Sequence, residues 1–242
     1  MGKLAIQNKE LIKDPSELVL NYPKLCLSVD CVIFGFSEKK LKVLVIQSDL
    51  EKYNGLYTLL GDVVHVDEET DNAAYRVLKQ RTGLTDVFLE QVKAFSHPTR
   101  HPGGRVVTIA YCSLINIKDH DLKITDNDLH WHEVDTIDKM GFDHKKILIT
   151  CYEWLQKMIK EDPLAFNLLP DKFSMRQLQN VYETIWDIEL DRRNFRKKFA
   201  SMDLLVDVGE MEEDVSHRPG KLFKFNFEKY HKQKKTWLGV DF

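Results

Sequence analysis

The functional side chains that are most closely spaced in this sequence are cationic. Five of the seven residues from Arg192 to Lys198 are Arg or Lys, and Phe195 and Phe199 stand four positions apart in the same stretch. On a helix, this spacing puts the aromatic rings on one side and the cationic groups on the other. A basic helix face binds phosphate groups, so the stretch is a candidate nucleic-acid contact. A solvated charged face is the plainer alternative.

The segments on either side would position this basic stretch. Ser174 can cap one helix, and Asp191 can cap a second helix after a short connector. Strand-like residues at 204–208 and 221–227 follow and bracket a polar loop. This order predicts a winged helix-turn-helix, whose second helix enters the major groove of DNA.

The expected DNA contacts divide by partner. Arginine can bind guanine bidentately and asparagine can bind adenine, so the start of the second helix would read bases: Arg192, Arg193 and Asn194. Later cations on that helix would contact phosphates: Arg196, Lys197 and Lys198. Further backbone contacts are expected from the start of the first helix and from the wing: Ser174, Arg176, Gln177, Arg218 and Lys221.

A second group of candidate residues lies within 61–84. With one inserted residue, Gly61, Glu68 and Arg76 resemble conserved positions of the Nudix box, a loop–helix–loop motif whose glutamates hold Mg²⁺ against a substrate diphosphate. The three helix glutamates of that motif are replaced by Val77, Gln80 and Arg81. An apolar group, an amide and a cation cannot take the place of three anions around a divalent ion. We therefore expect no metal, no cofactor and no hydrolysis; an amphipathic helix ended by glycine is the structural alternative.

A longer resemblance covers the C-terminal part. Residues 168–210 closely resemble the winged helix of Nudix-related transcriptional regulators of the NrtR type, through LLP, the F-S-x-x-x-L-Q-x-x-Y-E run at 173–183 and LDRRNFRKK at 190–198. The resemblance implies a homodimeric repressor whose winged helix binds a palindromic operator and whose Nudix-like domain senses a small molecule.

That family includes regulators of two kinds. Some members sense ADP-ribose and govern NAD synthesis, while others with a heavily eroded box control sugar use, notably of L-arabinose. Because the box is eroded here, the resemblance favours an L-arabinose-responsive repressor of carbohydrate use. An ADP-ribose-responsive regulator of NAD metabolism is the alternative, and an active Nudix hydrolase is a less favoured one.

The sequence predicts an α+β chain of two domains. A Nudix-like mixed-sheet domain over 1–160, with an N-terminal arm at 1–23, is followed by the winged helix domain over 161–242. In the first domain, strand patterns occur at 25–36, 41–47, 86–96 and 105–115, and helix patterns at 72–81 and 144–160. Thr70 or Asp71 can cap the first of these helices, which Gly83 would end, and Asp143 can cap the second.

The effector site is expected where polar residues interrupt the apolar pattern of the first domain. Asp30 falls inside the apolar run LSVDCVIF, so it is either paired within the core or turned toward a ligand. A neutral pentose needs hydroxyl partners and an apolar wall. The candidate residues are Asp30, Glu68, His97, Arg100, Arg105 and Tyr111.

Composition bounds the remaining possibilities. Thirty-five Lys and Arg against 38 Asp and Glu give a net charge of −3, and four scattered cysteines give no disulfide framework. No run of 18 apolar residues exists for a membrane helix, so we expect a cytoplasmic protein without a membrane partner. The HWH triplet at 130–132 is an adventitious ligand pair or, more simply, part of a strand.

Overall fold

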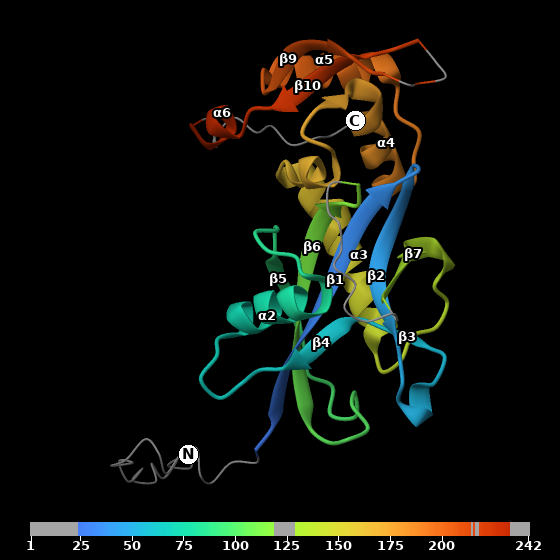
Figure 1. The fold of residues 1–242 in the computed structure, drawn as a ribbon, viewed down its shortest axis with the longest axis vertical. Coiled ribbons are helices and arrows are strands. Elements are labelled where there is room, and N and C mark those ends of the chain that lie inside the picture. The colour runs from blue at the N-terminus through green and yellow to red at the C-terminus, as the bar shows by residue number, and fades with distance from the viewer. Residues whose placement is uncertain (1–23, 119–128, 214, 216–217, 233–242) are drawn as a thin grey trace, which may run out of the picture.

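A computed structural model describes residues 24–118, 129–213, 215 and 218–232. The molecule is elongated, with a large sheet and its helices at one end and a small winged helix at the other (Figure 1). This arrangement confirms the predicted α+β class. The arm expected at 1–23 lies outside the described residues. Within them, no helix is both long and apolar enough to cross a bilayer.

Seven strands form the large mixed sheet. They are β1 (Cys26–Ser37), β2 (Lys40–Gln47), β3 (Tyr57–Thr58), β4 (Leu60–Val63), β5 (Glu90–Phe95), β6 (Val106–Asn116) and β7 (Leu129–Glu133). The order β3-β2-β1-β6-β5 has β4 pairing with β1 and β7 pairing with β2. Strands β1 and β6 are parallel, with Asp30 opposite Ala110 and Cys31 opposite Tyr111. This register decides which side chains share a face of the sheet.

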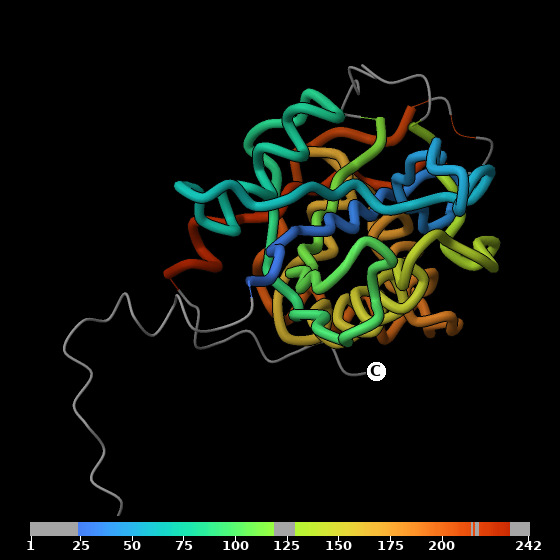
Figure 2. Tube along the Cα trace, turned by 90° about the horizontal axis from the view of Figure 1, so that it is seen from below, coloured from blue at the N-terminus to red at the C-terminus, as the bar shows by residue number. Residues whose placement is uncertain are grey.

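Two helices cover opposite faces of the sheet. Helix α2 (Thr70–Thr82) packs on Cys31 and Ile33 of β1, whereas α3 (His144–Glu161) belongs to the cluster that contains Val32 and Phe34. Because successive strand residues point to opposite faces, β1 is apolar on both sides. Figure 2 shows the strands running between the two helices.

The ends of the helices test the predicted caps. Gly83 ends α2 in the left-handed conformation, with φ 73°, as expected. The residue at the start of α2 is Glu69, and no side chain caps it, so the caps expected from Thr70 or Asp71 are wrong. Both of those side chains instead bond to the hydroxyl of Tyr111.

The second unit has the order of a winged helix. It comprises β8 (Phe173–Ser174), α4 (Met175–Trp186), α5 (Arg192–Met202), β9 (Leu205–Met211) and β10 (Lys221–Phe225), with a short α6 (Phe227–Lys232) after the wing. The three strands pair in the order β8-β10-β9. The predicted caps are confirmed, because Ser174 accepts a hydrogen bond from the Gln177 N–H and Asp191 accepts one from the Asn194 N–H.

One apolar cluster joins the two units. Phe166, in the short helix η3 (Leu164–Leu168) between them, stacks on Phe225 with ring centroids 4.0 Å apart and packs on Phe173 at 5.4 Å. The same cluster contains α3 and β1 side chains. Helix α3 ends at Glu161, and the boundary expected at 160/161 stays a prediction.

Candidate functional site

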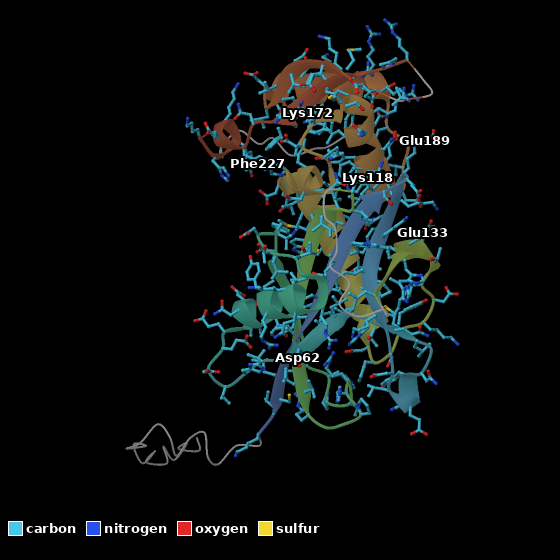
Figure 3. All side chains as sticks on the ribbon, in the orientation of Figure 1. Asp62, Lys118, Glu133, Lys172, Glu189 and Phe227 are labelled. Atoms are coloured by element: carbon cyan, nitrogen blue, oxygen red, sulfur yellow. The ribbon has the colours of Figure 1, made fainter. Side chains whose placement is uncertain are left out.

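A cavity of about 460 Å³ opens beside the start of α3 in the large-sheet domain. Asp30 of β1, Asp62 of β4, Arg81 of α2 and Arg100 of the loop before β6 line it. Asp62 lies near the end of the molecule that is far from Lys172 of the winged helix (Figure 3). A cavity of this size suits a small-molecule ligand.

A buried group of charges forms the wall of this cavity. Arg100 donates from Nε and Nη2 to the two Asp143 carboxylate oxygens, at 3.0 and 2.7 Å, and its Nη2 lies 3.4 Å from Asp30 Oδ2. The Arg100 side chain is 3% exposed, against 8% for Asp30 and 21% for Asp143. Arg100 thus bridges Asp30, which lines the cavity, and Asp143, and hydroxyl donors of a ligand would find the acceptor oxygens of Asp30 here.

His144 completes this group in a defined tautomer. Its Nδ1 accepts the Leu59 N–H at 2.9 Å, which leaves the proton on Nε2, 3.5 Å from Asp30 Oδ1. Burial lowers the pKa of His144 below its usual range, and the nearby Asp30 and Asp143 carboxylates only partly oppose that shift. A neutral imidazole here donates one proton toward Asp30.

Gly61 makes room for the Asp30 carboxylate. In the antiparallel pairing of β1 and β4, Gly61 lies opposite Asp30. A Cβ atom at position 61 would lie 2.3 Å from Asp30 Oδ1 and 2.7 Å from the Val29 carbonyl oxygen. Only glycine fits, so the residue that matches the first position of the Nudix-like motif here supports the buried acid.

An aromatic stack flanks the cavity. Phe142 lies between His101 and His144, with ring centroids 5.1 and 5.0 Å apart and interplanar angles of 11° and 29°. Its backbone has φ 53°, a left-handed conformation that is strained for a bulky residue. His101 and Phe142 both line the cavity and supply the flat wall that a sugar or base ring requires.

Of the six residues expected to bind the effector, the structure brings two together. Asp30 and Arg100 share the cavity wall. His97 lies in the same loop but is exposed, and Arg105 is exposed and donates to the Ser96 carbonyl at 2.6 Å. Neither of them lines the cavity.

Tyr111 and Glu68 do not line the cavity and make contacts elsewhere. Tyr111 pairs with Cys31 and therefore faces α2, away from Asp30; burial and the Asp71 carboxylate raise its pKa to about 12. Glu68 binds Arg76, with 2.8 Å between Oε1 and Nε. The guanidinium holds the pKa of Glu68 at about 2. Tyr111 and Glu68 thus stabilise the neighbourhood of α2.

Sequence reasoning missed Asp143, His144 and Phe142 as site residues. The sequence FDH at 142–144 signalled only the start of a helix, and the expected cap Asp143 makes no side-chain capping bond because Arg100 binds it. A signal was nevertheless present: three side chains able to bind a ligand stand in a row where a helix begins.

The residues present do not fit a Nudix-type Mg²⁺ site. Val77 is buried in the core, Gln80 is exposed, and Arg81 lines the cavity at the place expected for a third carboxylate. Within the described parts of the chain, no group of three or more His, Cys, Asp or Glu residues could hold a metal.

The HWH residues lie in β7, where the His130 and His132 rings are 6.2 Å apart.

At the other end of the molecule, α5 presents a basic face to solvent. Phe195 and Phe199 are buried, at 0% and 2% exposure, as their spacing predicted. Its first three residues, and the later cations Arg196 and Lys197, are exposed; Lys198 is partly buried. The positive end of the helix dipole adds to the side-chain charge at this start.

The start of α4 holds a buried helix cap. Ser174 is 2% exposed and forms a capping box with Gln177: its Oγ accepts the Gln177 N–H at 3.3 Å, and Gln177 Oε1 accepts the Ser174 N–H at 2.7 Å. The fold uses these polar atoms to cap α4, and a phosphate contact of Ser174 stays a prediction. Arg176 is half-buried next to them.

The wing keeps cations on its exposed edge. Arg218 is exposed, and Lys221 is exposed with Nζ 2.7 Å from Asp207 Oδ2. Ion pairs between exposed side chains contribute little, so a phosphate can compete for the Lys221 ammonium. Arg176, Arg196, Arg218 and Lys221 all line one hollow between α4, α5 and the wing.

Comparison with known proteins gives matches to both parts of the chain. Residues 165–225 match the model of the NrtR DNA-binding winged helix domain. The chain is 27% identical over 215 residues to the ADPR responsive transcriptional repressor NtrR of Acinetobacter baylyi, covering 87% of this chain and 86% of that protein.

Two solved structures extend the likeness. The NrtR of Shewanella oneidensis, in a crystal structure with a 27mer DNA, superposes with a TM-score of 0.73 at 25% identity, covering 82% of this chain and 93% of that one. The Nudix domain of the same protein, complexed with ADP ribose, covers 59% of this chain and 99% of its own with a TM-score of 0.50 at 25% identity. The chain therefore carries a winged helix domain of the NrtR type and is similar over most of its length to Nudix-related transcriptional regulators.

Proposed function

We propose that this chain is an effector-controlled repressor that binds palindromic operator DNA as a homodimer through α5. The observation that carries the proposal is the exposed row of Arg192, Arg193 and Asn194 at the start of a helix whose Phe195 is buried. Arg and Asn at the start of a recognition helix are the residue types that read guanine and adenine in the major groove. Two-fold symmetry of the dimer matches the symmetry of a palindrome.

The DNA contact is tested with operator selected from a random pool and measured by fluorescence anisotropy. Arg193→Ala removes a base contact and weakens binding to the selected sequence by about 5-fold to 150-fold, or about 1–3 kcal/mol. Lys157→Ala is the matched control, because Lys157 is an exposed cation of α3 with 71% of its side chain accessible. Equal affinities of Arg193→Ala and the natural chain would overturn the assignment of α5.

ADP-ribose is the effector that the relatives support. A curated relative is named for its response to ADPR, and the Nudix domain of a structural neighbour was solved with ADP ribose. The cavity offers Arg81 and Arg100 on the same wall as the stacked His101 and Phe142. Guanidinium groups suit a diphosphate, and the rings suit a base. Control of NAD metabolism would follow from this effector.

L-Arabinose is the second candidate, and the charges of the cavity wall favour it. Arg100 is already bonded to Asp143 and close to Asp30, so a diphosphate would compete with carboxylates for the guanidinium. The hydroxyls of a neutral pentose would instead donate to the Asp30 carboxylate, which lines the cavity. None of the comparisons bears on arabinose. Control of carbohydrate use would follow from this effector.

Calorimetric titration with ADP-ribose and L-arabinose in parallel separates the two. Asp30→Asn removes the buried charged acceptor, and we expect the affinity for the true effector to fall about 10-fold to 100-fold, because a hydrogen bond to a charged group contributes about 1.5–3 kcal/mol. Asp67→Asn, an exposed aspartate outside the cavity, is the control. Binding of neither compound to the natural chain would overturn both candidates.

The proposal includes the absence of hydrolysis. The motif-matching position Glu68 is bound to Arg76, and Val77 is buried, so the carboxylates that would hold Mg²⁺ are missing from their expected places. Incubation with ADP-ribose and Mg²⁺ should release no nucleotide. Release at an enzymatic rate would show that the cavity is catalytic.

A further inference from the structure

Helix α3 contacts both functional regions of the molecule. Its first residue, His144, lines the cavity, and Asp143, directly before it, binds the cavity residue Arg100. Tyr152 and Gln156, two and three turns further along, reach α4 of the winged helix. A continuous helix of 18 residues is about 27 Å long and moves as a unit, so a displacement at one end reaches the other.

The contact between α3 and α4 centres on one carbonyl group. Tyr152 Oη and Gln156 Nε2 each donate to the Ile185 carbonyl at 2.8 Å, and Trp186 Nε1 donates back to the Gln156 carbonyl at 2.9 Å. Ile185 stands in the last turn of α4, where carbonyls lack partners within their own helix. Side chains of α3 thus supply the hydrogen-bond donors that a carbonyl at the end of α4 lacks within its own helix.

The end of α4 is in turn fixed to the start of the basic helix. Gln179 Nε2 donates to the Leu190 carbonyl at 2.8 Å, and the Leu190 N–H donates to Glu183 Oε1 at 2.9 Å. Asp191 and α5 follow directly. The connector between the helices is therefore bonded to α4, and the orientation of α5 follows that of the α4 end.

At the cavity, Asp143, the residue directly before α3, has two sets of possible hydrogen-bond partners. An aspartate at this position ordinarily accepts hydrogen bonds from the first N–H groups of its helix. Asp143 makes no such bond and instead binds Arg100. A ligand that draws Arg100 away would free the Asp143 carboxylate to accept from the N–H groups of α3, which would give the start of the helix a second arrangement.

We propose that α3 couples the effector cavity to the DNA-binding unit, with Tyr152 and Gln156 as the coupling residues through their shared bond to the Ile185 carbonyl. The inference rests on the proposed function, because it requires an effector and an operator. Neither residue lines the effector cavity or belongs to α5, so their effect must fall on the coupling between the sites and not on either binding reaction alone.

The experiment measures operator affinity with and without saturating ADP-ribose or L-arabinose. In the natural chain the ratio of the two dissociation constants is the coupling, typically 5-fold to 150-fold in allosteric proteins. We expect Tyr152→Phe with Gln156→Met to reduce that ratio at least fivefold. Operator affinity without effector, and effector affinity without DNA, should stay within about threefold of the natural values.

Thr150→Val is the matched control. Thr150 Oγ1 donates to the Lys146 carbonyl at 2.9 Å, within α3 itself, so its loss removes a similar bond without touching α4. The control should keep the full ratio. Thermal melting of each variant is recorded first; if the double variant does not fold, Tyr152→Phe alone, which keeps the ring, is expected to lower the ratio at least twofold.

The outcomes distinguish the two proposals. A natural chain whose operator affinity responds to neither compound overturns the proposed function and this inference with it. A natural chain that responds, beside a double variant with an unchanged ratio, overturns only the inference. A ratio lost equally in Thr150→Val would also contradict it, since any weakening of α3 would then be enough.

Discussion

Replacing Arg100 with methionine tests the buried charge group of the cavity wall. Methionine has a comparable length but no charge, so Arg100→Met leaves Asp30 and Asp143 without their shared guanidinium partner. The loss of this partner is costly because the guanidinium is 3% exposed and the Asp30 side chain 8% exposed, so little water can replace the ion pair.

The magnitude follows from the burial of the partners. Breaking a buried ion pair by removing one partner costs about 3–5 kcal/mol. Asp143 is 21% exposed and partly solvated, so we expect a loss near the lower end, about 3 kcal/mol in the free energy of unfolding. That is a large part of the roughly 5–15 kcal/mol that stabilises a typical domain. Adding Asp143→Asn to the variant should recover at least about 1 kcal/mol.

Urea denaturation followed by circular dichroism measures these energies. Arg105→Met is the control, because Arg105 is an exposed arginine near the same loop that donates only to the Ser96 carbonyl, and its loss should cost less than about 1 kcal/mol. A cost of Arg100→Met below that of the control, or strict additivity of the Arg100 and Asp143 substitutions, would refute the interpretation of the group as a coupled buried cluster.

Three further substitutions test other parts of the structure. The ion pair with Arg76 holds the folded pKa of Glu68 at about 2, below the unfolded value of about 4.3, so the pair stabilises the fold above pH 4.3 and this stabilisation is lost as pH falls through 2. Denaturation at several pH values should show that the stability lost in Glu68→Gln shrinks to zero between about pH 5 and 2. A loss of stability that does not change with pH would argue against the pair. Gly61→Ala should lower the affinity of the cavity for its effector at least tenfold, since the new Cβ collides with Asp30, and calorimetry showing natural affinity would exclude that contact. Tyr182→Phe should leave stability unchanged or raise it by about 1 kcal/mol, since the buried hydroxyl has no partner among the described residues, whereas a loss above about 1 kcal/mol in urea denaturation would reveal one.

Local signals predicted the elements well, because each depends on a few neighbouring residues. Ser174 and Asp191 cap the helices that they were expected to cap, and Gly83 ends α2. The spacing of Phe195 and Phe199 predicted the buried face of α5 correctly. Short elements escaped prediction: β4 spans four residues and α6 six, too few for a periodic pattern to be recognised.

The effector site was predicted only in part because it depends on strand register. Asp30 and Tyr111 both interrupt neighbouring apolar strands, yet the parallel pairing of β1 and β6 places Tyr111 opposite Cys31 and so on the other face of the sheet. A shift of one residue would reverse that assignment. Asp143 was likewise assigned as a helix cap because its partner, Arg100, stands 43 residues earlier and no local pattern connects them.

The most direct test of the account is release of selected operator DNA by the effector, measured by anisotropy on the natural chain and on Asp30→Asn. We predict that ADP-ribose or L-arabinose releases the DNA from the natural chain. Asp30→Asn should bind the DNA equally well but need at least tenfold more of the same compound, because the substitution lies in the cavity wall and outside the winged helix. Release by neither compound, or release from both proteins at the same concentration, would contradict the account.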